Sequence, residues 1–309
     1  MIIFNFGLKS VNMQYNTIER AGIKVSSLSF GCMSLKSDTP QNDALIGKAI
    51  DAGITLFDTA DLYEKGENEK LLGKAIKGRH KDIAILTKVG NRWRSDGSGW
   101  DWCPQKQYIL SAADESLKRL QTDYIDIYLL HGGTTEDPSD DVIEAFERLK
   151  ELGKIRSYGI SSIRPNVIRK YVADYNIAAI MTQYSLLDRR PEEETLKLMH
   201  KNNVAVLARG TVAGGLLAGK PAYDYLDMDT EQISSIINKL NTTLTGRVLT
   251  EKAYRYVMDN PAITTAVAGI RTEKQLEQAL AAAEAAPLTV QERGILQDVW
   301  AGNKYVQHR

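Results

Sequence analysis

The chain has 309 residues, of which 43% are hydrophobic and 25% charged, and its 39 basic residues balance its 39 acidic ones. This ordinary composition and zero net charge argue against a nucleic-acid or membrane-surface partner, because both need an excess of basic residues. No apolar run approaches the roughly 20 residues of a transmembrane helix, so we expect no membrane partner.

The chain begins with MIIFNFGLKSVN, which has apolar residues but lacks the basic region and small-residue cleavage site of a secretory signal. We expect residues 1–12 to form a short N-terminal extension and residues 13–309 to form a single domain. Two cysteines, Cys32 and Cys103, cannot build a disulfide framework. Together with the lack of a signal, they predict a cytoplasmic location.

Eight short runs of apolar, β-favouring residues recur along the chain. Most of them lack polar alternation, which is typical of parallel strands that are covered on both faces. The expected strands cover residues 28–31, 55–60, 83–89, 125–131, 155–161, 177–184, 203–210 and 264–270.

The segments between these runs carry helical signals. Residues 138–154 place Val142, Phe146 and Leu149 on one face and reach a stop at Gly153. Residues 107–120 and 273–286 read the same way, and the long gap 211–263 is expected to hold a loop and one or more extra helices. Repeated strand–helix units predict an α/β fold, the closed (β/α)8 TIM barrel, because parallel strands need crossover helices. A doubly wound sheet is the alternative, although no GxGxxG follows the first strand.

In such a barrel, the active-site groups lie at the carboxyl ends of the strands. Asp58, Lys88 and His131 end the second, third and fourth expected strands, and Tyr63 follows Asp58 by five residues. A buried Asp58 needs a positive partner, which Lys88 can supply, and an ammonium beside Tyr63 would lower the pKa of the phenol. His131 can hydrogen-bond the same substrate oxygen.

Taken singly, an acid at a strand end is usually a turn former, and a tyrosine or histidine is usually a packing residue. Four such residues at the ends of three successive strands favour a group that delivers a proton to one oxygen.

Other barrel chemistries fit the strand ends less well. Retaining glycosidases need two facing carboxylates, whereas the fourth and seventh strands end in His131 and Arg209. The four histidines show no metal-ligand spacing, so we expect no metal site. A Schiff-base role for Lys88 is disfavoured, because Asp58 would keep its amine protonated.

The second half of the chain has two segments suited to an anion. Residues 209–220, RGTVAGGLLAGK, have small side chains that let backbone N–H groups approach a diphosphate, with Lys220 as a point charge. Residues 268–280 place Arg271, Thr272 and Gln275 at a helix start, which favours a phosphate. A ligand-free lid and an ordinary helix cap are the respective alternatives. Beside a proton donor, these segments suggest carbonyl reduction by a phosphorylated nicotinamide.

The motifs DTADLY, ILTKVG, DYIDIYLLH, GKIRSYGIS and YSLLDR together make the sequence resemble an aldo-keto reductase, from about residue 13 to residue 287. The resemblance implies a catalytic tetrad of Asp58, Tyr63, Lys88 and His131. In it, Tyr63 is the general acid, Lys88 lowers the pKa of Tyr63, Asp58 holds Lys88, and His131 orients the carbonyl. The implied cofactor is NADPH, and the implied substrate is a small-molecule carbonyl compound.

The resemblance also implies a set of cofactor-binding residues, most of them at the strand ends and in the two anion segments. They are Gly31, Cys32, Met33, Asp58, Ser161, Ser162, Arg209, Gly210, Thr211, Val212, Ala213, Gly214, Lys220, Gly269, Arg271 and Gln275. Several positions depart from the family pattern and indicate a divergent branch: Ser162 stands for the usual Asn, Met181 for Gln, Arg209 for an aromatic residue, and Gln278-Ala279 for Glu-Asn.

The resulting expectation is an NADPH-dependent reductase of aldehydes and ketones. The alternative is a cofactor-binding regulatory subunit with little turnover, like the potassium-channel beta subunits that resemble this family. Substrate preference would come from loops such as residues 91–104, where Trp93, Trp100 and Trp102 either line an apolar pocket or pack the loop.

Overall fold

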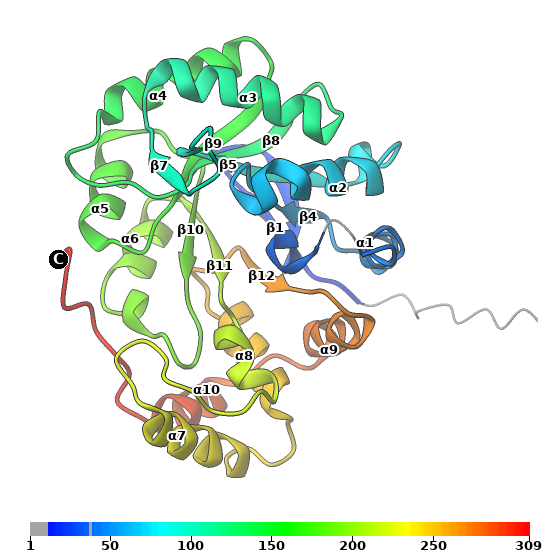
Figure 1. Cartoon of the computed structure of the whole chain (residues 1–309). Coiled ribbons are helices and arrows are strands. Elements are labelled where there is room, and N and C mark those ends of the chain that lie inside the picture. The colour runs from blue at the N-terminus through cyan, green and yellow to red at the C-terminus, as the bar shows by residue number, and fades with distance from the viewer. Residues whose placement is uncertain (1–11, 37–38) are drawn as a thin grey trace, which may run out of the picture.

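The computed structural model describes residues 12–36 and 39–309, so residues 1–11 of the expected extension lie outside the described part. Eight parallel strands close into a barrel in the order β10-β11-β12-β3-β4-β5-β8-β9 (Figure 1). Their bounds are β3 Leu28–Gly31, β4 Leu56–Asp58, β5 Ala84–Val89, β8 Ile125–Leu130, β9 Ile155–Ser161, β10 Ala179–Gln183, β11 Ala205–Arg209 and β12 Thr265–Gly269. The eight expected strands and the closed barrel are therefore confirmed, and the doubly wound alternative is wrong.

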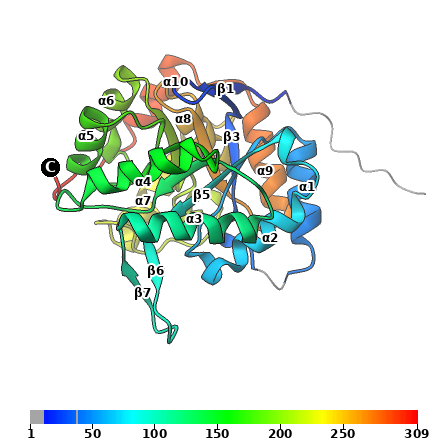
Figure 2. The same ribbon diagram turned by 90° about the horizontal axis from the view of Figure 1, so that it is seen from above.

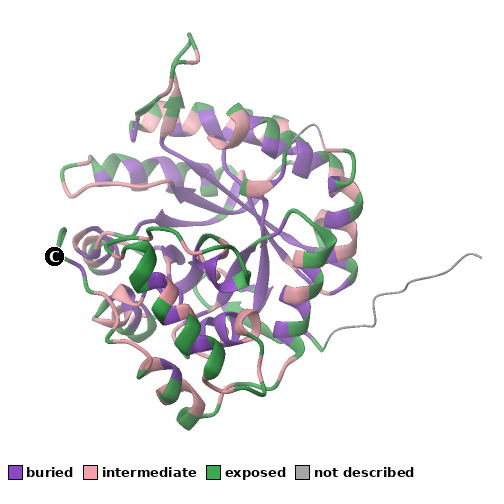
Figure 3. Ribbon diagram, turned by 60° about the horizontal axis from the view of Figure 1, so that its bottom comes forward, coloured by how far each residue is buried: buried purple, intermediate pink, exposed green. Residues whose placement is uncertain are grey.

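The apolar runs fold this way because each strand is buried on both faces. Leu56, Leu86 and Ile127 point into the barrel and share one buried cluster. Their neighbours Phe57 and Tyr128 belong to the larger cluster that also contains helix residues. Figure 3 shows the barrel strands largely buried, while the surrounding helices expose their outer faces.

Helices connect successive strands and surround the barrel (Figures 1 and 2). Their bounds are α1 Asn42–Asp51, α2 Glu67–Ala75, α3 Lys106–Leu120, α4 Ser139–Glu151, α5 Pro165–Asp174, α6 Thr195–Lys201, α7 Thr230–Thr242, α8 Leu249–Met258, α9 Glu273–Glu284 and α10 Val290–Gln297. Short 3-10 segments are η1 Cys32–Ser34, η2 Tyr63–Gly66, η3 His80–Asp82, η4 Arg190–Glu192 and η5 Ala213–Ala218. The expected helical face of α4 is confirmed, since Val142, Phe146 and Leu149 are buried. The gap 211–263 holds η5, α7 and α8, as expected.

Two antiparallel hairpins lie outside the barrel sheet. Strands β1 Tyr15–Ile18 and β2 Ile23–Ser26 form the first, and Ile18 and Val25 are buried among residues that line the barrel, so this hairpin closes its amino-terminal end. Strands β6 Asn91–Trp93 and β7 Trp100–Trp102 form the second, which projects from the body of the molecule (Figure 2). None of the described helices combines the length and apolarity that crossing a membrane requires.

Candidate active site

Strand alternation places Asp58 and Lys88 in the uppermost layer of the barrel interior. Asp58 lies two residues beyond the inward-facing Leu56, and Lys88 lies two residues beyond Leu86, so both side chains also point inward. Asp58 is 5% exposed and Lys88 is 1% exposed. The Lys88 Nζ donates a hydrogen bond to Asp58 Oδ1, which gives each buried charge its partner.

Tyr63 completes the bonding of this ammonium. Lys88 Nζ donates to the Thr59 carbonyl oxygen at 2.8 Å and to Tyr63 Oη at 3.1 Å. With the bond to Asp58, all three ammonium protons are used. Because Tyr63 Oη accepts this bond, its own O–H proton is left for another acceptor. The Tyr63 hydroxyl therefore keeps a proton that it can donate in a further hydrogen bond.

A turn in left-handed backbone conformation brings Tyr63 over the barrel. Glu64 and Lys65 have φ values of 48° and 57°, and Gly66 follows at 89°. A Cβ at Gly66 would stand 2.7 Å from Cδ of Arg119, so only glycine fits there. The side chain of Arg119 in turn donates to the fully buried Glu69 at 2.6 Å. Arg119 of α3 thus packs against the turn and helps to fix its position.

His131 lies directly after β8 and faces Tyr63. The two rings meet edge to face, with centroids 5.8 Å apart and planes at 82°. The backbone N–H of His131 donates to the Val89 carbonyl oxygen at 2.7 Å, while its buried Nδ1 has no hydrogen-bond partner among residues 12–36 and 39–309. Burial, followed by the charges of Lys88 and Arg209, lowers the pKa of His131 to about 3. The imidazole is therefore neutral near pH 7 and carries one N–H.

The electrostatics of the phenol differ in one respect from the sequence-based expectation. Burial raises the pKa of Tyr63 above its ordinary value, and it outweighs the opposing charges of Lys88 and Arg209. Burial also lowers the pKa of Lys88, but Asp58 and Tyr63 more than compensate, so the net pKa is raised. The charge of Lys88 therefore acts to lower the pKa of Tyr63, as expected. It does not lower this pKa enough to bring it near 7. Near pH 7 the site holds a protonated phenol beside an ammonium, which is an acid poised to donate.

The expected cofactor residues after β3 and β9 also lie at this end of the barrel. Gly31 pairs with Gly269 on one side and with Asp58 on the other, so a Cβ at Gly31 would stand only 3.2 Å from the Ala268 carbonyl oxygen. Cys32 is buried, whereas Met33 is 62% exposed. Ser161 and Ser162 are both buried, and Ser162 Oγ accepts from the Arg164 N–H at 3.1 Å.

The loop after β11 contains several residues in left-handed conformation, namely Gly210, Ala213, Gly214 and Gly215. It starts from Arg209, whose Nη1 donates to Gln183 Oε1 at 2.8 Å. Thr211 is buried, Val212 half-buried and Gly214 exposed. Lys220 Nζ donates to the Gly214 carbonyl oxygen at 2.8 Å, so this lysine folds back on its own loop.

The third group of expected residues lies at the start of α9. Arg271 and Gly269 are exposed, and Arg271 has no ion-pair partner in the part of the chain that the structure describes. Gln275 Oε1 accepts from the Arg271 backbone N–H at 3.0 Å, and Thr272 Oγ1 accepts from the Gln275 N–H at 3.2 Å. The helix cap thus uses Thr272 and Gln275, and the Arg271 guanidinium takes no part in it.

Several residues that support the site escaped the sequence analysis. Asn68 accepts from Thr59 Oγ1 and donates to the Cys32 and Leu35 carbonyl oxygens, which links β4 to the segment after β3. Glu69 accepts from Thr87 Oγ1 at 2.6 Å as well as from Arg119. Their place at the start of a helix is visible in the sequence, but their partners lie up to 50 residues away and leave no local signal.

The β6–β7 hairpin contacts the loop that carries Tyr63 and the loop that follows His131. Trp93 Nε1 donates to the Leu62 carbonyl oxygen at 3.2 Å, beside Tyr63. Trp102 Nε1 donates to Asp137 Oδ1 at 2.9 Å, and a Cβ at Gly90 would collide with the Trp102 ring. Trp100 is 51% exposed. The indoles of Trp93 and Trp102 therefore pack the loop, and lining of a substrate pocket stays a prediction.

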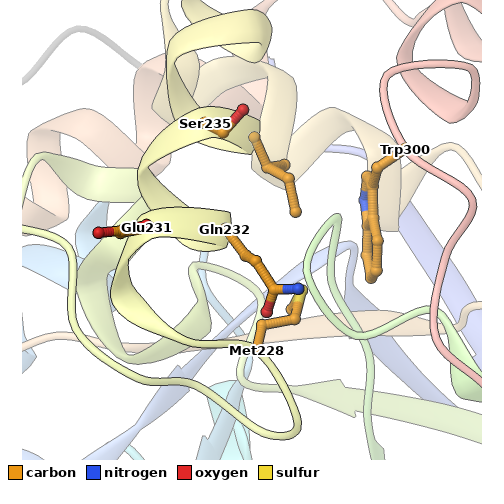
Figure 4. A pocket seen from close by; sticks show the side chains of 6 residues that line it. Met228, Glu231, Gln232, Ser235 and Trp300 are labelled. Atoms are coloured by element: carbon orange, nitrogen blue, oxygen red, sulfur yellow. The ribbon is translucent and has the colours of Figure 1, made fainter.

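A cavity of about 610 Å³ lies elsewhere, between the beginning of α7 and the C-terminal segment. Figure 4 shows Met228, Glu231, Gln232 and Ser235 on one side of it and Trp300 on the other. None of the tetrad residues lines this cavity. Among residues 12–36 and 39–309, no group of three or more histidine, cysteine or acidic side chains could hold a metal ion.

Comparisons with known proteins point in one direction. The Aldo/keto reductase family model matches residues 27–301. The Uncharacterized oxidoreductase YqkF of Bacillus subtilis (strain 168) is 42% identical over 306 residues, which cover 96% of this chain and 100% of the relative. Aldo-keto reductase yakc [NADP(+)] of Schizosaccharomyces pombe is 34% identical over 63% of this chain and 60% of its own length. The holo form of aldo-keto reductase AKR11C1 from Bacillus halodurans superposes with a TM-score of 0.92 at 45% identity, over 96% of this chain and 100% of that one.

Proposed function

Because the chain belongs to the aldo-keto reductase family, we propose that this oxidoreductase uses NADPH to reduce small aldehydes and ketones to alcohols. One observation carries the proposal. The buried Lys88 ammonium donates to Asp58, to the Thr59 carbonyl oxygen and to Tyr63 Oη at once, which leaves the phenolic O–H of Tyr63 free to protonate a substrate oxygen.

Each member of the tetrad then has a defined task. A carbonyl oxygen that accepts from Tyr63 and from the N–H of the neutral His131 is oriented and polarised. When bound, NADPH supplies the hydride to the carbonyl carbon. Tyr63 passes its proton to the carbonyl oxygen, and the Lys88 ammonium stabilises the phenolate that remains. Asp58 keeps Lys88 charged and in place.

The residues that would hold the cofactor fit its charges. Arg271, exposed at the beginning of the 12-residue helix α9, suits a phosphate such as the adenosine 2′-phosphate. The loop from Gly210 to Gly214, with its left-handed residues, suits the diphosphate. Residues Gly31–Met33 and Ser161–Ser162 border the tetrad and suit the nicotinamide end. The name of the S. pombe relative includes NADP(+), which supports the same choice of cofactor.

A cytoplasmic location belongs to the same proposal. Both cysteines are free and buried, as befits a protein of a reducing compartment. The expected partners are the cofactor and a small carbonyl compound.

The test is a carbonyl panel with the purified chain. We expect oxidation of NADPH, followed by its absorbance, with activated aromatic aldehydes, and one equivalent of alcohol for each NADPH consumed. Tight NADPH binding without turnover on aliphatic and aromatic aldehydes and ketones would instead favour a cofactor-binding regulatory subunit.

A further inference from the structure

Arg209 is fixed at the mouth of the barrel by a neutral partner. It is the last residue of β11 and lies beside Gln183 of β10 in the sheet register. Its Nη1 donates to Gln183 Oε1 at 2.8 Å. The amide nitrogen of Gln183 donates to Asp188 Oδ2 at 2.9 Å and to Tyr225 Oη at 3.2 Å, so the amide oxygen must face Arg209.

The charge of Arg209 is therefore not compensated by an ion pair. The nearby carboxylate of Asp188 is engaged by both Nε and Nη2 of Arg190, at 2.8 and 2.7 Å. No acidic group forms a salt bridge with Arg209 within residues 12–36 and 39–309. Lys88 at the same end of the barrel differs, because Asp58 neutralises it.

Arg209 lies two residues beyond Leu207, which lines the barrel interior, so this uncompensated cation points inward at the same carboxyl end of the barrel as the catalytic groups. Its charge helps to lower the pKa of His131, after burial and Lys88. It also opposes the rise that burial causes in the pKa of Asp58 and Tyr63. With Tyr63 and His131 neutral, the charges of Asp58, Lys88 and Arg209 leave the site with one net positive charge.

Any hydride donor must bind near the catalytic groups, and therefore near the positive charge of Arg209. The carbonyl carbon lies one bond from the oxygen that Tyr63 protonates, and the donor carbon must approach it to about 3–3.5 Å. Hydride transfer moves two electrons and one hydrogen from the dihydronicotinamide to the carbonyl carbon, while Tyr63 gives a proton to the oxygen. The nicotinamide ring is neutral before this step and cationic after it. A nearby unpaired guanidinium repels only the second form.

We propose that Arg209 makes the site discriminate between the two redox forms of the cofactor, binding NADPH more tightly than NADP⁺ and speeding the release of NADP⁺. The inference rests on the proposed function. Both forms carry the same diphosphate and 2′-phosphate, so discrimination must arise near the ring. For two positive charges several ångströms apart at a half-buried site, the expected preference is roughly 10- to 100-fold.

The experiment measures the dissociation constants of NADPH and NADP⁺ by calorimetric titration, without turnover. In Arg209→Met, the ratio of the NADP⁺ constant to the NADPH constant is expected to fall by about 10- to 100-fold. Arg209→Lys, which keeps the charge, should retain most of the preference. Gln183→Glu, which gives Arg209 a carboxylate partner, should lower the ratio while leaving the arginine in place.

Arg271→Met is the matched control, because it removes a cation from the expected phosphate site and should weaken both forms equally. An unchanged ratio in both Arg209→Met and Gln183→Glu, or equal weakening of the two forms in Arg209→Met, would overturn the inference and place Arg209 on a phosphate. Failure of the wild-type chain to bind either form would instead refute the proposed function itself, and the inference with it.

Discussion

The two halves of the barrel mouth differ in whether their charged side chains are paired within the protein. On the side of β4, β5 and β8, Asp58 and Lys88 are almost fully buried, and each is satisfied by a neighbour in the protein. On the side of β11, β12 and α9, Arg209 and Arg271 lack carboxylate partners among the described residues, and Arg271 is exposed. The half around Tyr63 is thus paired within the protein, whereas Arg209 and Arg271 have no acidic partner among the described residues. This preorganised half should be sensitive to mutation in both folding and catalysis, and the other half in binding alone.

The largest effect is expected from breaking the buried pair. Lys88→Met removes the partner of Tyr63 and leaves Asp58 ionisable without a counter-charge. The free energy of unfolding should fall by about 3–5 kcal/mol, and turnover should fall by about 10²- to 10⁴-fold. Chemical denaturation and NADPH oxidation measure the two quantities.

The double variant Lys88→Met with Asp58→Asn serves as the control. Removing the acid as well should restore much of the stability but none of the turnover. A double variant no more stable than Lys88→Met alone would show that the unpaired Asp58 was not the cause.

On the ligand side, Arg271→Ala should weaken NADPH binding without affecting folding. The lost charge-assisted contact to the 2′-phosphate corresponds to about 1.5–3 kcal/mol, or roughly 10- to 150-fold in the dissociation constant. NADH lacks that phosphate, so its affinity should change little. Equal losses for the two cofactors in binding titrations would mean that Arg271 does not contact the 2′-phosphate.

Asp61 is a buried acid beside the tetrad, and we expect its burial to lower the free energy of unfolding. Its Oδ1 has no hydrogen-bond partner within the described ranges, and burial, followed by the charge of Glu69, raises its pKa to about 8. Between about pH 4 and pH 8 the folded state therefore binds more protons than the unfolded state, so this residue lowers stability as the pH rises.

Asp61→Asn should remove that pH dependence. The free energy of unfolding of the variant, relative to wild type, should rise by about 1–2 kcal/mol from pH 5 to pH 8. Denaturation curves at several pH values measure the slope. The exposed Asp227→Asn serves as the matched control for removing one carboxylate from the chain. Parallel curves for Asp61→Asn and wild type would contradict the raised pKa.

The smallest effect is expected for Lys220→Ala. This exposed lysine donates to the Gly214 carbonyl oxygen of its own loop. Its loss should change the NADPH dissociation constant by no more than about threefold, since exposed charge contacts contribute little. A loss as large as that of Arg271→Ala would show that Lys220 turns to the cofactor on binding.

Features set by local sequence could be predicted, whereas features that depend on residues far apart in the chain could not. The barrel strands and the positions of Asp58, Lys88 and His131 follow from local apolar runs that end in a charged or polar residue, and Tyr63 follows from its spacing. The closing hairpin β1–β2 and the projecting hairpin β6–β7 were not predicted, because polar or charged residues interrupt each of their short strands and leave no apolar run. The Glu69–Arg119 contact joins residues 50 positions apart, and the net rise in the pKa of Tyr63 depends on burial that no local pattern reveals.

Tyr63→Phe provides the most direct test of the central claim that Tyr63 donates the proton. This variant removes only the hydroxyl that accepts from Lys88 and leaves the ring beside His131. We expect the NADPH dissociation constant to stay within about threefold of wild type, while the single-turnover rate of NADPH oxidation with a carbonyl substrate falls by at least about 10²-fold. A variant that binds NADPH normally and oxidises it at the wild-type rate would contradict the account.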